Sequence, residues 1–375
     1  MFPDGWGRKC KLTIDRTKVN SAATDFPVLC TVDNLPSEMF DADGDYPALN
    51  GGGDIRFSSD SGGAIQLPCE IVKFVTDNNP ANGLAEIWVK VPTVNAAEIG
   101  GGGTDTDFYI WYNKTGETQP ARNDAYGLEN VWDSDYKAVY HCSDATTSTT
   151  LDSTSNLNHI TKKAANTPSE IAGKWSAALG QDFDTDEYMS APDDVSLDGM
   201  QKLTLSCWCY ANSFRAAGSK YNILINKWIS GGTDAAYLGP FIWTSKWGYY
   251  LGGASAYGGN LSIGAPAIST WYYINLTYDG SVATNNTYLW QNTTPYGVYS
   301  HNLGTLDNCT DLLYIGNFRT LSDYNWDGII DEVRISAKKR DAWIITEYNN
   351  QNDPATFISV GTPTGQYIPK VIIIN

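Results

Sequence analysis

Apolar and polar residues alternate in short runs along most of this chain, and a period of two is the pattern of a β-strand with one buried face. In the first third of the chain, turn clusters rich in Gly, Asp and Ser separate these runs. The runs cover residues 9–15, 26–32, 54–59, 65–75, 84–92 and 107–113. Strands at this spacing predict a β-sandwich domain over residues 1–115.

A second and longer series of β-type runs follows residues 116–135, a polar segment broken by Gly and Pro that we interpret as a connector. These runs cover residues 137–143, 176–183, 188–193, 203–211, 221–228, 237–245, 247–253, 270–279, 286–292, 312–317 and 328–336. Because they show hardly any helical periodicity, we expect a large two-sheet jelly roll over residues 136–340. The predicted fold class is therefore all-β, with an N-terminal β-sandwich followed by a larger jelly roll.

Helical spacing occurs in residues 339–351, where Trp343, Ile344 and Glu347 recur at helical intervals. We predict a short helix there, packed on the edge of the sandwich. This helix opens the last part of the chain, residues 341–375, and the rest of that part returns to β character.

The C-terminal segment, residues 366–375, ends in β-branched residues from Val371 to Ile374. Pro369 cannot donate to a central ladder, so the segment should lie at a sheet edge. An exposed edge strand promotes aggregation unless something covers it. Two arrangements would cover it: the segment pairs with an open edge of the first domain, or it adds a strand to another copy of the chain or to another surface or virion protein.

Charge and composition argue against several classes of function. The chain has 42 acidic and 25 basic residues, and its formal charge of −17 repels phosphate backbones, so we expect no nucleic-acid binding, whereas cations such as calcium are favoured. No apolar run approaches the roughly 18 residues of a membrane helix, which predicts no membrane insertion.

Cysteine usage and the N-terminus indicate where the chain folds. The seven cysteines lack the spacing of a zinc site, and we predict small buried thiols. The first residues show no charged segment followed by an apolar run, so we expect no signal peptide and no export through the general secretion route. Both features favour folding in a reducing cytoplasm.

Four segments carry a family resemblance. They contain "GKWSAALGQDF", "WYYINLTYDG", "LLYIGN" and "WDGIIDEVRIS", in this order. Residues 136–340 thereby resemble the LamG-like or concanavalin A-like jelly-roll family, which is specific for fold and weak for function. Residues 1–115 resemble the uncharacterised β-domain that often precedes these modules in bacterial, archaeal and viral surface proteins.

An acidic pair, Asp331 and Glu332, lies inside the apolar run of residues 328–336. Strand interiors disfavour carboxylates, and alternation predicts that one of the two faces the core and the other the solvent. The resemblance implies a structural calcium ion bound by Asp331, with further oxygens from the region of Asp144. The alternative is that Asp331 accepts hydrogen bonds from the backbone or from an arginine at a sheet corner.

Catalytic motifs are missing from the sequence. Glycan hydrolases with this jelly roll use an E-x-D-x-x-E strand, and no such spacing occurs here. A G-x-S-x-G nucleophile motif is also absent, and we interpret His141, His159 and His301 as structural. We therefore predict that the protein is not an enzyme.

Residues 241–257 are rich in aromatic side chains, on which the flat faces of sugars stack. Sandwich cores also use aromatic residues, and about half of these should face inward. Trp247 and Tyr257 have glycine-rich flanks that predict exposed loop positions, and Trp243 is the third candidate for glycan binding.

Two functions compete on these observations. The first is a non-enzymatic surface or structural protein, such as a phage-type virion decoration, fibre or adhesion component that binds glycans through its jelly roll. The second is a carbohydrate-active enzyme or a secreted carbohydrate-binding module. The missing paired carboxylates, the free cysteines and the missing leader favour the first, located on a virion or an extracellular surface.

Overall fold

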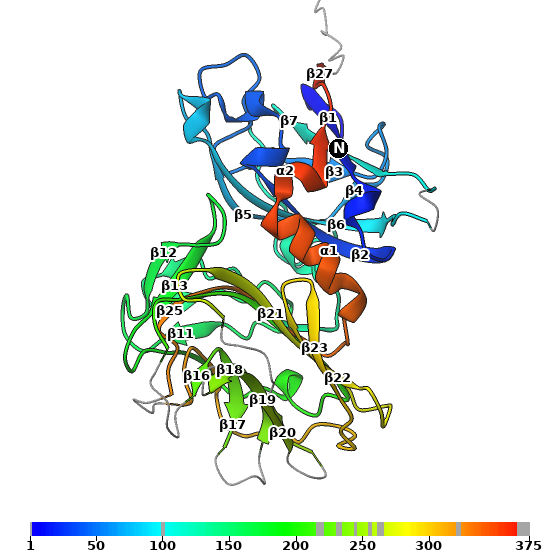
Figure 1. Ribbon diagram of the computed structural model, residues 1–375. Coiled ribbons are helices and arrows are strands. Elements are labelled where there is room, and N and C mark those ends of the chain that lie inside the picture. Colours follow the sequence, from blue (N-terminus) through cyan, green and yellow to red (C-terminus); the bar gives the residue numbers. More distant parts are fainter. Residues whose placement is uncertain are drawn as a thin grey trace, which may run out of the picture. The chain divides into compact units, whose positions relative to one another are not determined.

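The computed structural model describes residues 2–98, 102–214, 221–229, 235–243, 246–253, 257–260, 266–319 and 324–365. This part of the chain is nearly all β, as predicted, and the chain divides into two compact units (Figure 1). The first unit is Met1–Asp133 together with Ile345–Asn375, and the second is Ser134–Ile344. No helix among the described residues is long and apolar enough to cross a membrane.

Two antiparallel sheets form the first unit. The larger contains, in spatial order, β26 (Ile358–Val360), β1 (Arg8–Ile14), β7 (Thr106–Tyr112), β3 (Arg56–Ser58) and β4 (Gln66–Leu67), with β27 (Thr364–Gly365) also on β1. The smaller contains β2 (Ala23–Thr31), β6 (Leu84–Val94) and β5 (Cys69–Val75). Short 3-10 helices lie at Arg16–Lys18, Val32–Asn34, Ser37–Phe40, Pro80–Asn82 and Leu128–Asn130. On β1 the predicted alternation holds, because Cys10, Leu12 and Ile14 are buried and Lys11 is exposed.

Residues near the C-terminus complete this unit. The predicted helix is confirmed as α1 (Asp341–Asn352), and α2 (Pro354–Phe357) follows it. The side chain of Asn350 accepts a hydrogen bond from the backbone N–H of Leu29 at 2.7 Å and donates to its carbonyl at 3.0 Å. β26 then pairs with β1, so the part of the chain after the helix supplies strands to the first sheet.

The segment predicted as a connector packs within the first unit. Tyr126 accepts a backbone hydrogen bond from Cys69, and the indole of Trp132 donates to Glu70 at 2.8 Å. Residues 116–133 thus lie on the first unit, and the boundary falls between Asp133 and Ser134.

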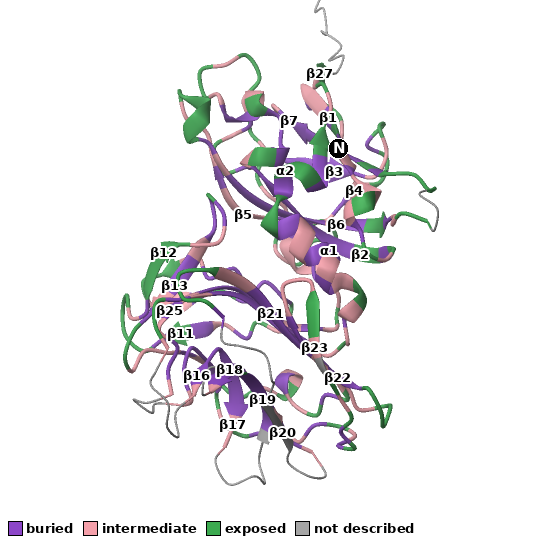
Figure 2. Cartoon of the chain, in the orientation of Figure 1, coloured by how far each residue is buried: buried purple, intermediate pink, exposed green. Residues whose placement is uncertain are grey.

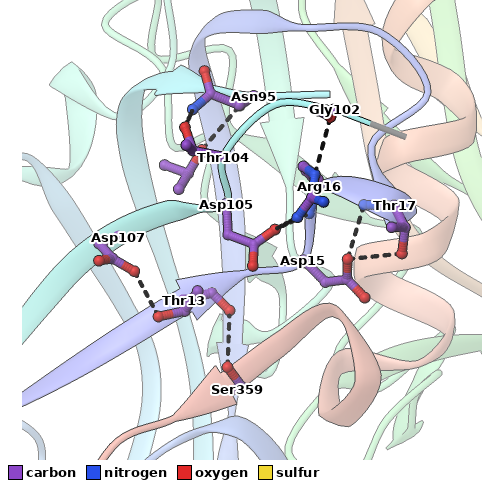
Figure 3. Close-up of polar contacts among 11 residues, drawn as sticks. Thr13, Asp15, Arg16, Thr17, Asn95, Gly102, Thr104, Asp105, Asp107 and Ser359 are labelled. Carbon is purple, nitrogen blue, oxygen red and sulfur yellow. Dashed lines mark hydrogen bonds and ion pairs between the residues drawn. The ribbon is translucent and has the colours of Figure 1, made fainter. Parts of the chain in front are cut away.

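Polar side chains link the strands β26, β1 and β7 of the first sheet and the segments next to them (Figure 3). Asp107 accepts a hydrogen bond from the hydroxyl of Thr13 at 2.6 Å, and Asp105 accepts one from the guanidinium of Arg16 at 2.9 Å. The hydroxyl of Ser359 donates to the carbonyl of Thr13. These aspartates, which contribute to the negative charge, therefore have local donors.

Two larger antiparallel sheets form the second unit. The ten-stranded sheet contains β20 (Tyr257–Asn260), β19 (Lys246–Leu251), β18 (Ala235–Trp243), β17 (Ile225–Trp228), β24 (Leu313–Ile315), β14 (Met189–Ala191), β11 (Ile160–Lys162), β10 (Thr149–Thr150) and β9 (Asp144–Thr146), with β16 (Asn222–Ile223) on β18. The eight-stranded sheet contains β12 (Ser169–Ala172), β13 (Leu179–Phe183), β25 (Gly328–Ser336), β15 (Lys202–Ala211), β21 (Trp271–Asp279), β22 (Thr287–Gln291) and β23 (Thr294–Tyr299), with β8 (Tyr136–Tyr140) on β25. A 3-10 helix lies at Val195–Leu197.

The core of the second unit contains side chains from both of its sheets, and Figure 2 colours most of their central strands as buried. Leu205 and Ile274 come from the eight-stranded sheet, and Ile225 and Leu313 come from the ten-stranded sheet. A single apolar cluster containing residues of both sheets is the arrangement of a sandwich. The predicted two-sheet architecture is thereby confirmed.

All seven cysteines are free and buried, as predicted. Cys207 and Cys209 both belong to the core of the second unit, as expected for residues two apart on one strand.

Candidate functional site

The acidic pair lies in the middle of β25, and the carboxylates of Asp331 and Glu332 are both fully buried. Glu332 has a φ of 51°, and the pairing of β25 with β15 shifts register between Ser206 and Trp208. Such a β-bulge inserts one extra residue and breaks the alternation of side chains. The prediction that one carboxylate faces solvent was therefore wrong. Because Ile330 and Val333 are both in the core, the two carboxylates between them lie on the other face of the sheet.

Glu332 forms a buried ionic cluster with two partners. Its Oε1 lies 2.5 Å from Nδ1 of His141, and its Oε2 accepts a hydrogen bond from Nη2 of Arg334 at 2.6 Å. Burial alone would raise the pKa of Glu332, but the charges and hydrogen bonds of His141 and Arg334 outweigh it and hold this pKa below its usual value. The expectation that His141 is structural agrees with these contacts.

The carboxylate of Asp331 lies between two backbone N–H groups. Its Oδ2 accepts a hydrogen bond from the N–H of Lys174 at 2.9 Å, and its Oδ1 accepts one from the N–H of Glu332 at 2.8 Å. A Cβ on Gly173 would lie 2.3 Å from Oδ2, so only glycine allows this approach. Burial and then the neighbouring Glu332 carboxylate raise the pKa of Asp331. The alternative interpretation, hydrogen bonding to the backbone, describes these contacts.

Asp144, the second predicted calcium ligand, begins β9. Its Oδ2 lies 2.6 Å from the ammonium of Lys162, whose side chain is fully buried, and its Oδ1 accepts a hydrogen bond from Gln181 at 3.2 Å. Calcium requires about six to eight oxygens with free lone pairs. The carboxylates of Asp331 and Asp144 are instead bonded to N–H donors, so these two residues do not fit a calcium site. Calcium binding by this chain stays an untested prediction.

Trp247, predicted as an exposed sugar-binding ring, is fully buried in β19. Its indole N–H donates to Gln291 at 3.0 Å, and its ring belongs to the core. The prediction of an exposed loop was wrong because Gly248 continues the strand and pairs with Phe241 instead of forming a turn. Tyr257 begins β20, and its side chain lies outside the described residues.

Trp243 belongs to a group of rings on the outer face of the ten-stranded sheet, the face turned away from the core. This outer aromatic cluster consists of Tyr221, Trp228, Phe241, Trp243, Tyr250, Phe318 and Tyr324, packed around Ile223. Apart from the buried Phe241, its rings are partly exposed. Strand alternation explains why Tyr250 lies on the outer face, since its neighbours Tyr249 and Leu251 point into the core.

The rings of the cluster contact one another closely. The ring centroids of Tyr221 and Phe241 are 4.7 Å apart, and Phe241 stacks on Tyr250 at 5.5 Å with an angle of 24°. Trp228 lies 5.8 Å from Tyr250, and Tyr324 lies 5.7 Å from Tyr221. The cluster offers flat apolar area to a ligand.

Polar groups border this area. The hydroxyls of Tyr221 and Tyr250 lie 3.3 Å apart, and burial together with this contact raises the pKa of Tyr221, whose hydroxyl therefore stays protonated. Lys246 is the exposed cross-strand partner of Trp243. The members of the cluster provide contact surface and neutral hydrogen-bonding groups, which suit binding.

Sequence reasoning identified only part of this cluster. Phe241, Trp243 and Tyr250 lie in the aromatic run, whereas Tyr221 precedes β16 and Tyr324 precedes β25. Sheet pairing brings these segments together, and the sequence contains no local signal for it.

Residues 183–362 match the family described as the concanavalin A-like lectin/glucanases superfamily. This match covers both sheets of the second unit from the last residue of β13 onward and continues through α1, α2 and β26. The second unit is a concanavalin A-like domain. The sequence resemblance to this fold is thereby confirmed.

Solved structures similar to this chain include the binding domain of botulinum neurotoxin DC in complex with rat synaptotagmin II (12% identity, 60% of this chain and 52% of that one, TM-score 0.43). Another is domain 4 of an extracellular arabinanase from Geobacillus stearothermophilus in complex with arabinotriose (14% identity, 57% and 98%, TM-score 0.44). A third is the binding domain of Paraclostridial mosquitocidal protein 1 (12% identity, 57% and 52%, TM-score 0.45). The chain thus spans about half the length of these toxin domains. The comparison with curated proteins gave no match.

Proposed function

We propose that the concanavalin A-like domain is a non-catalytic carbohydrate-binding domain and that the outer aromatic cluster is its binding surface. The observation that carries this proposal is the grouping of seven aromatic side chains from separate segments on one sheet face, six of them partly exposed. An apolar group of this size on a sheet face turned away from the core marks a site of interaction. The superfamily matched by residues 183–362 includes lectins and glucanases, which agrees with a sugar as the ligand.

The chemistry of the cluster suits a sugar. One face of a sugar ring presents mainly C–H groups, which pack on an aromatic ring, while its hydroxyls require hydrogen-bonding partners at the border. The paired hydroxyls of Tyr221 and Tyr250 supply such partners. Trp243 and Trp228 supply the largest partly exposed rings.

A glycan array with a reducing-sugar assay tests the proposal. We expect the full chain to retain defined glycans without releasing reducing ends. Trp243→Ala and Trp228→Ala should each weaken binding by about tenfold or more, the loss typical of a central aromatic anchor. Tyr126→Ala is the control, since this exposed ring belongs to the first unit. Hydrolysis would contradict a non-catalytic role, and unchanged binding in both tryptophan variants would exclude the cluster as the site.

We further propose that the chain works as a virion or extracellular surface component that joins other copies or other surface proteins through its C-terminal strand. Residues 366–375 lie outside the described residues. In support, Gly365 of β27 pairs with Arg8, which is the first residue of β1. The strand β1 therefore has no residue beyond this pair that could pair with a continuation of β27. The free buried thiols also suit assembly in a reducing compartment.

A further inference from the structure

Asn226 in β17 is an unusual residue of the ten-stranded sheet. Its side chain is fully buried, and neither its amide nitrogen nor its amide oxygen has a hydrogen-bond partner among the described residues. Burying an unpaired amide costs folding free energy, so each such group in a folded protein requires an explanation.

The position of Asn226 connects it to the outer aromatic cluster. Ile225 points into the core, so Asn226 points to the outer face, and Trp228 two residues later shares that face. On one side Asn226 pairs with Tyr314 of β24, and on the other with Leu238 of β18, which itself pairs with Tyr250. The amide therefore lies on the same face as the ring of Trp228, two residues along β17, and the ring of Tyr250, two strands away on β19.

The amide selects the ligand by its hydrogen-bonding chemistry. It presents one acceptor and one NH₂ donor, and a pair of sugar hydroxyls satisfies both. A carboxylate or sulfate group accepts hydrogen bonds but cannot donate to the amide oxygen, and an alkyl group does neither. The chain's charge of −17 also disfavours an anionic ligand.

We infer that Asn226 is the polar anchor of the carbohydrate site and that its ligand is an uncharged saccharide with two neighbouring hydroxyls, one accepting from Nδ2 and one donating to Oδ1. This inference rests on the proposed function. The amide is fully buried in the free protein, so a sugar reaches it only if a neighbouring side chain on that face moves. Bound ligand then satisfies an amide that has no partner among the described residues.

The test uses Asn226→Leu in the full chain, with Asn275→Leu as a matched control. Asn275 in β21 is also fully buried, with both amide atoms unpaired among the described residues, but it belongs to the eight-stranded sheet. The probes are laminarin, xylan, arabinan and polygalacturonate, with binding followed by affinity electrophoresis and tryptophan fluorescence.

The wild type should bind at least one of the neutral polymers, with a change in tryptophan fluorescence, and should not bind polygalacturonate. Asn226→Leu should melt at the same or a higher temperature and lose affinity by about tenfold or more, the loss expected from one unpaired hydrogen-bonding group. Asn275→Leu should keep the wild-type affinity. Binding of Asn226→Leu at wild-type affinity would overturn the inference and assign Asn226 a purely structural role.

A measurement on the wild type covers the case in which Asn226→Leu does not fold. The O-methylated form of the polymer that binds keeps its apolar faces but cannot donate hydrogen bonds, so we expect it not to bind. Retention of the methylated polymer would contradict the role of the amide while leaving the aromatic site in place. If the wild type binds none of the polymers, the proposed function fails together with this inference.

Discussion

The ammonium of Lys227 lies 3.1 Å from the carboxylate of Asp198, at a position where no part of the lysine side chain is exposed. Asp193 accepts from the same nitrogen at 2.6 Å, and the backbone carbonyls of Cys309 and Asp311 are further acceptors. The buried ammonium of Lys227 thus contacts four oxygens from separate segments of the concanavalin A-like domain.

Lys227→Met should destabilise that domain by about 3 kcal/mol, because removing one partner of a buried ion pair leaves uncompensated carboxylates. This loss is at the low end of the range typical of broken buried ion pairs, since Asp193 is partly exposed and can be hydrated. Urea denaturation measures the effect. Lys202→Met is the control, because its pair with Asp279 involves a lysine that is 42% exposed, and it should cost less than about 1 kcal/mol. Equal losses in both variants would contradict the special role of Lys227.

Chelation should leave the melting temperature of the concanavalin A-like domain unchanged. Both oxygens of Asp331 already accept backbone N–H bonds, and Asp144 is paired with Lys162. Differential scanning calorimetry with EDTA and with added calcium checks this expectation. A cation that binds only the folded state stabilises it by mass action, so melting that falls with EDTA and recovers with calcium would restore the calcium site to this domain.

Acid should remove a stabilising contribution of Glu38 in the first unit. Burial opposes its ionisation, but two hydrogen bonds from Arg8 and one from the hydroxyl of Tyr112 lower the pKa of Glu38. A lowered folded-state pKa gives stability that is present above the unfolded value of about 4.3 and is lost as pH falls through the folded value.

The difference in stability between wild type and Glu38→Gln should therefore shrink on acidification below about pH 4, which denaturation curves at several pH values can measure. In an Arg8→Gln background the same substitution should show a weaker pH dependence, because the main partner of the carboxylate is gone. A difference that is constant with pH would contradict the role of the ionised carboxylate.

Deletion of residues 366–375 tests the proposed contact between subunits. If the C-terminal strand augments a neighbour, the truncated chain should fold as a monomer with unchanged melting and fail to join its assembly. Size-exclusion chromatography and calorimetry make these two measurements. A destabilised first unit with assembly intact would instead show that the segment pairs within its own chain.

The regular strands and the helix could be predicted from the sequence because their patterns are local. From Cys10 to Ile14, β1 buries every second residue as its alternation requires, and α1 begins at Asp341, within two residues of the predicted start. The concanavalin A-like fold could be recognised because its core strands keep their order and spacing along the chain.

The site could be predicted only in part. The sequence around Glu332 contains no signal that predicts its positive φ. This one backbone angle places its carboxylate on the same side of the sheet as that of Asp331, whereas alternation predicts opposite sides. Gly248 resembles a loop residue in sequence but continues a strand, which places Trp247 in the core. The rings that join Trp243 on the sheet face come from distant segments, and only the tertiary pairing of strands brings them together.

The pairing of Leu12 with Val360 has a consequence for the order of events on the ribosome. At the usual rates of translation, β26 emerges on the order of tens of seconds after β1. The second unit, Ser134–Ile344, is contiguous and can complete its sheets within that interval. In the nascent first unit, the edge of β1 that pairs with β26 stays unpaired until β26 has been synthesised. An open edge invites pairing with other chains, so we expect crowded polysomes and early truncation to cause misassembly through β1.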